Sequence, residues 1–108
     1  FIEADRGTET VAGLRTKSFT HKIQAYQAYF ASEAILARYG SRAIRVLVVT
    51  TGTKRAEALV AAAEAVGARR RFWFTTAEAL AKAEAQLLHA PIWRVASEPG
   101  MHALIPRP

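Results

Sequence analysis

An eight-residue run at positions 43–50, AIRVLVVT, constrains the fold more than any other stretch of the chain. Apolar residues fill six of its eight positions, so the alternation expected of a strand with one wet face is missing. A short and nearly continuous apolar run indicates a strand that is covered on both faces. Such strands occur in parallel or mixed sheets with helices packed against them. The run therefore predicts an α/β domain.

Other strand and helix patterns alternate along the chain. We expect further strands at about 1–4, 69–75 and 92–95, and helices at about 19–39, 54–66 and 75–88. Alternation of this kind implies right-handed crossovers between neighbouring strands. The sequence thus predicts one sheet of about four strands, mixed or mostly parallel, flanked by helices.

Particular residues mark the ends of the expected helices. Gly40 and Gly67 follow the first two helical patterns, where glycine favours the left-handed C-cap conformation. Thr75 and Glu78 form a Thr-x-x-Glu capping box at the start of the third helix. Pro91 ends that helix and precedes the last expected strand.

Apolar spacing predicts which side chains form the core. One apolar stripe at helical spacing runs along the first helix and comprises Ile23, Tyr26, Phe30, Ala34 and Ala37. In the strand at 69–75, the alternation places Phe72 and Phe74 on the core face and Trp73 on the opposite face. Trp93 is also expected in the core.

The length of 108 residues allows one domain. We assign residues 1–96 to the α/β domain and residues 97–108, with three of the four prolines, to a tail. The chain begins at Phe1 rather than Met, so we interpret it as a piece of a longer protein, its C-terminal part, or as a processed product. The absence of cysteine excludes disulfides and thiolate metal sites. The sequence contains no signal peptide and no apolar run of membrane-spanning length, so the cytoplasm is the expected location and no membrane partner is expected.

The chain carries a net charge of +6, and eleven of its fifteen basic residues are arginine. The guanidinium fork of arginine suits contacts with phosphate groups. A GC-rich genome would also favour arginine without any functional cause. The charge is therefore an unspecific indication of nucleic-acid binding.

Two acids lie in the first expected strand. Glu3 and Asp5 are two residues apart, so their side chains point to the same face of a strand. The apolar run at 1–4 predicts a buried strand, and burying two carboxylates is costly unless a metal ion or a cationic side chain compensates. The alternative is a strand end that enters solvent, with Arg6 as a surface partner of little energetic worth.

Lys22 and Tyr26 share one face of the first expected helix, because they are four residues apart. A lysine beside Glu3 and Asp5 could balance their charge, and it could orient a water molecule while Mg²⁺ held by the carboxylates stabilises developing negative charge. The alternative places Lys22 in solvent and Tyr26 in the core.

These residues resemble a known family. The strings IEADRGTE at 2–9, KI at 22–23 with Tyr26, RVLVVT at 45–50 followed by Arg55, and PIW at 91–93 look like the replication-relaxation family. That family is associated with plasmid replication and relaxation of plasmid DNA. The resemblance covers roughly residues 1 to 95, and it implies a DNA-acting domain of a plasmid or mobile-element protein. DNA is the partner it implies, and replication proteins or a second copy of the chain are further expected partners.

The strand–helix–strand pattern is also similar to the second half of the restriction-endonuclease-like fold of PD-(D/E)XK nucleases. Glu3 matches the acidic position of that motif, whereas Asp5 stands where its lysine is expected. Lys22 on the following helix would then take the part of the lysine, as in some members. The resemblance implies a metal-dependent phosphodiesterase that nicks DNA. Glu3, Asp5 and Lys22 would be its catalytic residues, and Glu3 and Asp5 would hold Mg²⁺ or Mn²⁺.

Two basic stretches are candidate nucleic-acid contacts in addition to Arg6. Lys54 and Arg55 open the second helix, whose free amides can bind an anion such as a DNA phosphate. Arg69 and Arg70 precede an aromatic strand at a turn, where they could attract a nucleic-acid backbone without reading sequence. For both stretches the alternative is exposed cations at an ordinary turn.

Three functional hypotheses follow. The first is the metal-dependent nuclease-like domain. The second is a module with a nuclease-like fold that binds DNA or protein without catalysis. The third is a scaffold or oligomerisation domain, which would expose a large apolar patch.

Overall fold

The computed structural model describes residues 1–4, 14–32, 34, 37–38 and 45–105. One sheet is formed by the strands β1 (Ile2–Ala4), β2 (Val46–Thr50), β3 (Phe72–Thr76), β4 (Trp93–Val95) and β5 (Met101–His102). The helices of the described residues are α1 (Leu14–Ala31), α3 (Thr53–Ala65) and α4 (Ala77–Ala83), and α4 continues into a 3₁₀ turn, η1 (Glu84–Gln86). The prediction of an α/β fold with a mixed sheet is confirmed, although the sheet has five strands instead of about four.

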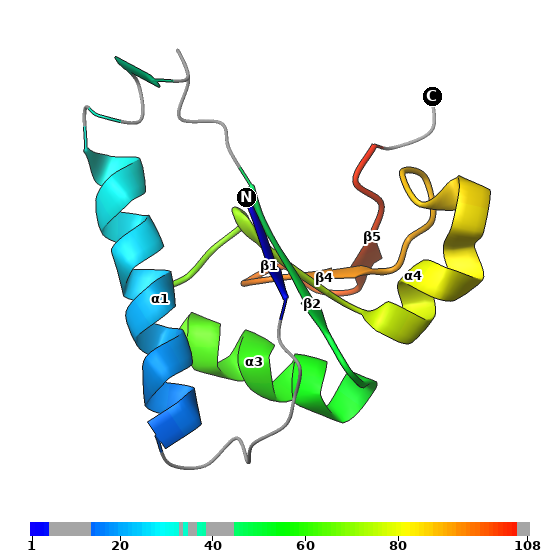
Figure 1. Cartoon of the computed structure of the whole chain (residues 1–108), viewed down its shortest axis with the longest axis horizontal. Helices are drawn as coiled ribbons and strands as arrows, with labels where there is room; N and C mark the ends of the chain where they lie inside the picture. Colours follow the sequence, from blue (N-terminus) through cyan, green and yellow to red (C-terminus); the bar gives the residue numbers. More distant parts are fainter. Residues whose placement is uncertain (5–13, 33, 35–36, 39–44, 106–108) are drawn as a thin grey trace.

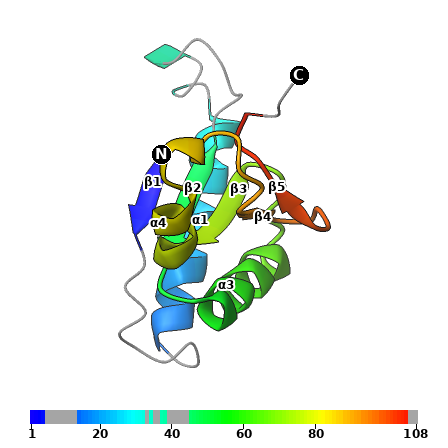
Figure 2. The ribbon, with the colours of Figure 1, turned by 90° about the vertical axis from the view of Figure 1, so that its right-hand side faces the viewer.

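The strands lie in the sheet in the order in which they occur along the chain. The first three are parallel to one another, and β4 and β5 are antiparallel to their neighbours. Because the order advances in one direction, right-handed crossovers place α1 and α3 on the same face of the sheet. Figure 1 shows α1 on one side of the sheet and α4 on the other, and Figure 2 shows the strands side by side from β1 to β5.

The core lies between the sheet and the helices α1 and α3. Buried apolar side chains of α1, β2, α3 and β3 form it, namely Ile23, Phe30, Val46, Val48, Leu59, Val60, Ala63, Phe72 and Phe74. The predicted alternation in β3 is confirmed, since Phe72 and Phe74 are buried and Trp73 is half-buried on the opposite face. Trp93 is also buried, as predicted.

The first strand is less buried than predicted. Its Ile2 side chain is 76% exposed, and Ala4 is also exposed. The physical reason is that β1 is an edge strand, and both crossover helices cover the other face of the sheet. The side chain of Glu3 alternates with Ile2 and Ala4, so it faces α1.

The first helix begins earlier and ends earlier than predicted. It starts at Leu14 instead of about residue 19, and it ends at Ala31 instead of about residue 39. After its last turn, the backbone amide and the hydroxyl of Ser32 both donate hydrogen bonds to the Tyr29 carbonyl oxygen. A serine that bonds the last turn in this way competes with helix continuation. Ala34 and Ala37 are exposed, so their predicted place in the core was wrong.

Two other helix ends can be compared with the prediction. After α3, the Ala68 and Gly67 amides donate to the Ala63 and Glu64 carbonyl oxygens, and Gly67 has φ +83°, which completes a Schellman cap. This confirms the glycine C-cap, while Gly40 lies outside the described residues. At the start of α4, Thr76 instead of Thr75 is the N-cap.

Thr75 does not cap the helix because its side chain is already engaged in the interior. It is buried, and its hydroxyl donates a hydrogen bond of 2.8 Å to the Ile92 carbonyl oxygen. The side-chain oxygen of the next residue, Thr76, accepts the Ala79 amide at 3.1 Å. The α-helix that follows ends at Ala83 rather than at about residue 88, and Glu84 has φ +44°.

The tail contributes the fifth strand. In β5, His102 pairs with Trp93 and Met101 pairs with Arg94. The Ile105 amide also donates to the Leu88 carbonyl oxygen at 2.8 Å. Within the part of the chain that the structure describes, no helix combines the length and the apolar character needed to cross a membrane.

Candidate functional site

The structure brings Glu3, Lys22 and Tyr26 together at one corner. Glu3 lies in the middle of β1, opposite Val48 of β2, and the other two residues lie one turn apart on α1. The Tyr26 hydroxyl donates a hydrogen bond of 2.5 Å to Oε1 of Glu3, and Nζ of Lys22 lies 3.5 Å from Oε2. These residues line an open hollow of about 340 Å³. Of the predicted corner, Asp5 lies outside the described residues.

Tyr26 joins this corner to the core. Its ring lies 5.5 Å from the ring of Phe1, 6.0 Å from that of Phe30 and 6.3 Å from that of Phe72. Burial raises the pKa of Tyr26 to about 12, and the hydrogen bond to Glu3 and its negative charge act in the same direction. The hydroxyl therefore stays protonated at neutral pH and serves Glu3 as a hydrogen-bond donor.

The described part of this corner does not by itself fit Mg²⁺ or Mn²⁺. Such ions need several oxygen ligands. The corner supplies one carboxylate, Glu3, and its two oxygens already face Tyr26 and Lys22. Among the described residues, no group of three or more histidine and acidic side chains could hold a metal ion. The Lys22 ammonium balances the Glu3 charge. The described corner is therefore an ion pair whose carboxylate also accepts a hydrogen bond from Tyr26.

A second group of candidate residues gathers at the amino ends of the parallel strands. Val46 pairs with Phe72, so the residues just before them, Arg45 and Arg71, lie at the same end of the sheet. Arg69 and Arg70 precede Arg71 in the turn that enters β3. We call these four arginines the basic end. The sequence indicated the run from Arg69 to Arg71, whereas only the strand register shows that Arg45 is its neighbour.

Aromatic side chains hold two of these arginines. The guanidinium of Arg71 lies 4.8 Å from the centre of the Phe30 ring, on the helix-covered side of the sheet. That of Arg45 lies 4.4 Å from the Trp73 ring, and its Nη1 donates to the Leu104 carbonyl oxygen at 2.7 Å. Cation–π contacts of this kind position a guanidinium while leaving its charge in place.

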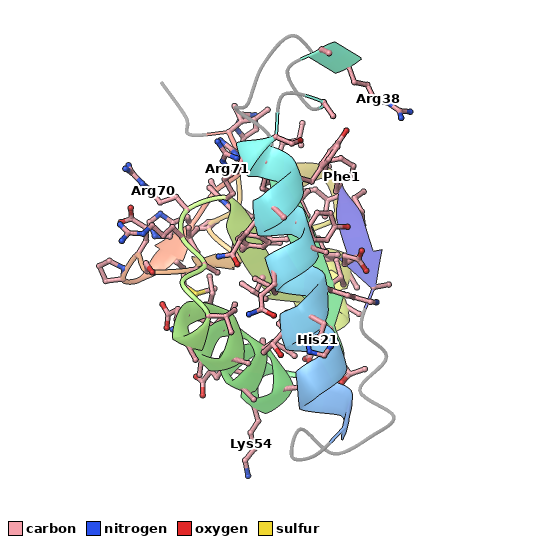
Figure 3. All side chains as sticks on the ribbon, turned by 90° about the vertical axis from the view of Figure 1, so that its left-hand side faces the viewer. Phe1, His21, Arg38, Lys54, Arg70 and Arg71 are labelled. Atoms are coloured by element: carbon pink, nitrogen blue, oxygen red, sulfur yellow. The ribbon has the colours of Figure 1, made fainter. Side chains whose placement is uncertain are left out.

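The other predicted nucleic-acid contacts lie elsewhere. Lys54 is exposed and Arg55 half-buried in the first turn of α3, which follows the carboxyl end of β2. The length of β2 separates this turn from the basic end by on the order of 17 Å. Figure 3 shows Lys54 at one end of the molecule and Arg70 and Arg71 towards the other. The two predicted basic stretches therefore do not form one continuous patch, and Arg6 lies outside the described residues.

Comparisons of the chain with protein-family models, with curated proteins and with solved structures give no match. The resemblances to the replication-relaxation family and to the restriction-endonuclease-like fold therefore stay predictions.

Proposed function

We propose that this chain is a DNA-binding module whose basic end contacts backbone phosphates. The observation that carries the proposal is the placement of Arg45, Arg69, Arg70 and Arg71 at the amino ends of two adjacent strands, with Arg71 on one face of the sheet and Arg45 on the other. Among the described residues, one of these four arginines forms an ion pair. It is Arg70, whose Nε lies 3.4 Å from Oε1 of Glu98. The charge of the basic end is thus largely available to an anionic partner.

The proposed binding is electrostatic and independent of sequence. Arginine contacts to phosphate position a protein on nucleic acid without reading bases. The net charge of +6 adds long-range attraction to a polyanion. The resemblance to the replication-relaxation family supports DNA as the partner.

Phosphodiester hydrolysis is the second candidate function. The 3.5 Å contact between Lys22 and Glu3 favours it, because a nuclease of the predicted class needs a lysine beside its acidic residue. It also requires further metal ligands, for which the sequence offers Asp5. The described residues do not supply such a set, so binding without catalysis is the function that the geometry supports best.

One experiment separates the two candidates. Fluorescence anisotropy measures the affinity for a labelled duplex as the salt concentration rises, and a nicking assay follows supercoiled plasmid with Mg²⁺ or Mn²⁺. If all four arginines contact phosphate, the affinity should fall about 150-fold between about 50 and 200 mM salt. Glu3→Gln and Lys22→Ala should leave this binding within about threefold of the unchanged protein.

The outcomes differ clearly. Salt-sensitive binding without nicking supports the binding module. Nicking that both substitutions abolish supports the phosphodiesterase instead. The absence of binding even at about 50 mM salt, where electrostatic contacts are strong, would refute DNA binding by this chain.

A further inference from the structure

A second hollow, of about 440 Å³, opens beside the basic end. It lies between the last turns of α1 and the turn that links α3 to β3. Its lining includes three consecutive arginines, residues 69–71, together with Gln27 and Gly67. No carboxylate is among its lining residues. Its volume falls in the range of about 300–1,000 Å³ that is typical of small-molecule sites. The hollow can therefore admit a group larger than a single ion.

The backbone of the arginine turn is fixed from within the protein. The carbonyl oxygens of four consecutive residues, 68–71, all accept hydrogen bonds. The Ser97 hydroxyl donates to Ala68 and the Phe72 amide to Arg69. The Trp73 indole donates to Arg70 and the Val46 amide to Arg71. These bonds are 2.6 to 3.0 Å long. The carbonyl lone pairs are thus engaged inside the protein, and the guanidinium groups extend from an ordered backbone.

The side chains around the hollow differ in how they are held. Arg71 is half-buried against Phe30, which places its charge at the wall. Arg69 is exposed and makes no ion pair within the described residues. Gln27 donates from Nε2 to the Val66 carbonyl oxygen at 3.2 Å, so the opposite wall is also ordered. The hollow therefore combines fixed walls with positive charge that no lining acid neutralises.

We infer that this hollow is a nucleotide-phosphate site, in which Arg69 and Arg71 bind the phosphate and the remaining volume admits the attached sugar. The guanidinium fork matches two phosphate oxygens, and little ordering is needed because the turn is already fixed. The inference rests on the proposed function, because the expected occupant of the hollow is one nucleotide of a bound DNA strand. A free nucleotide would present the same chemistry.

The test is an NMR titration with three small probes and one oligonucleotide. Thymidine 5′-monophosphate and inorganic phosphate should shift the amide resonances of Gly67 to Phe72 and the side-chain amide of Gln27. Uncharged thymidine should not shift them. A single-stranded octathymidylate should shift the same resonances at much lower concentration if the site belongs to a DNA-binding surface.

Three variants make the test specific. Arg69→Gln removes an exposed charge, and Arg71→Lys keeps the charge but removes the fork. Each should weaken octathymidylate binding about tenfold, and Arg69→Gln should also lower the salt slope by about 0.7. Lys82→Met removes one charge from α4, which contributes no residue to the hollow, and should leave binding within about twofold. Thermal melting checks that all three variants are folded.

The results separate the nucleotide-phosphate site from the proposed DNA binding. If the oligonucleotide binds but the resonances of the hollow do not move, the site is refuted and DNA binding survives. If neither the oligonucleotide nor the labelled duplex binds while the mononucleotide still shifts the hollow, the site stands as a free-nucleotide site and the proposed function fails. Equal shifts with thymidine and its monophosphate would refute phosphate recognition.

Discussion

Replacing Tyr26 with phenylalanine removes the hydroxyl that joins α1 to Glu3 while keeping the ring in the core. The lost bond is 2.5 Å long and ends on a charged oxygen. Hydrogen bonds to charged groups contribute about 1.5–3 kcal/mol. The Glu3 side chain is 31% exposed, so its carboxylate can regain water in the variant, and we expect a loss of about 1–2 kcal/mol at pH 7.

The pH dependence of this loss follows from the pKa. Burial, assisted by Glu3, raises the pKa of Tyr26 from 10.0 to about 12 in the folded protein. Below pH 10 the hydroxyl is protonated in both the folded and the unfolded protein, and its contribution to the free energy of unfolding is fully present. Between pH 10 and about 12 the unfolded chain ionises first, so the contribution falls as pH rises and is lost above about 12.

Urea unfolding at pH 8 and pH 11 measures both effects. The difference in unfolding free energy between the unchanged protein and Tyr26→Phe should shrink to less than half its value between these two pH values. Tyr29→Phe is the matched control, since within the described residues the Tyr29 hydroxyl makes no hydrogen bond, and it should change stability by less than about 0.5 kcal/mol. Equal stability of Tyr26→Phe and the unchanged protein at pH 8, or a difference that persists undiminished at pH 11, would show that the bond from Tyr26 to Glu3 does not stabilise the fold in this way.

Three further predictions concern the scaffold. Gly67→Ala should cost about 1–2 kcal/mol in thermal melts because φ is +83° there, although a Cβ would meet nothing closer than 3.9 Å. Gly52→Ala, at φ −155° with open space, is the control and should cost less, only the preference for glycine over alanine at the N-cap of α3. Thr76→Ala should cost about 1 kcal/mol through loss of the cap on the Ala79 amide, and Thr76→Ser should retain most of it. Lys82→Met breaks an exposed i,i+4 pair and should leave the urea midpoint nearly unchanged; a clear fall of the midpoint would contradict the surface assignment.

Much of the fold could be predicted from the sequence because its main elements have strong local signals. The apolar run before Thr50 marks β2, the alternation of Phe72 and Phe74 marks β3, and Gly67 marks the end of α3. In each case one local property, namely continuous hydrophobicity, a period of two or a left-handed glycine, agrees with the tertiary structure.

The misses have two kinds of cause. The end of α1 depends on a local contact, in which Ser32 bonds back to Tyr29, and the apolar stripe does not reveal it. The cap of α4 depends on a tertiary contact, because the Thr75 hydroxyl is held by the Ile92 carbonyl oxygen just before β4. The strand β5 has only two residues, and pairing with β4 defines it, so no pattern could indicate it.

The candidate site divides in the same way. The i,i+4 spacing of Lys22 and Tyr26 was visible in the sequence, and the structure places both beside Glu3. The basic end was visible only as a run of arginines. Strand register brings Arg45 to the basic end, and helix packing brings Gln27 to the opposite wall of the hollow; a sequence displays neither.

The most direct test of the account compares two double variants that remove the same amount of charge. Arg69→Gln/Arg70→Gln changes the basic end, and Lys54→Gln/Lys82→Gln changes other exposed positions. The salt dependence of duplex binding by fluorescence anisotropy is measured for both. If the basic end contacts phosphate, only the first double variant should lower the slope of log affinity against log salt, by about two. Equal slopes for the two double variants would show that net charge alone drives binding, and would contradict the assignment of the basic end.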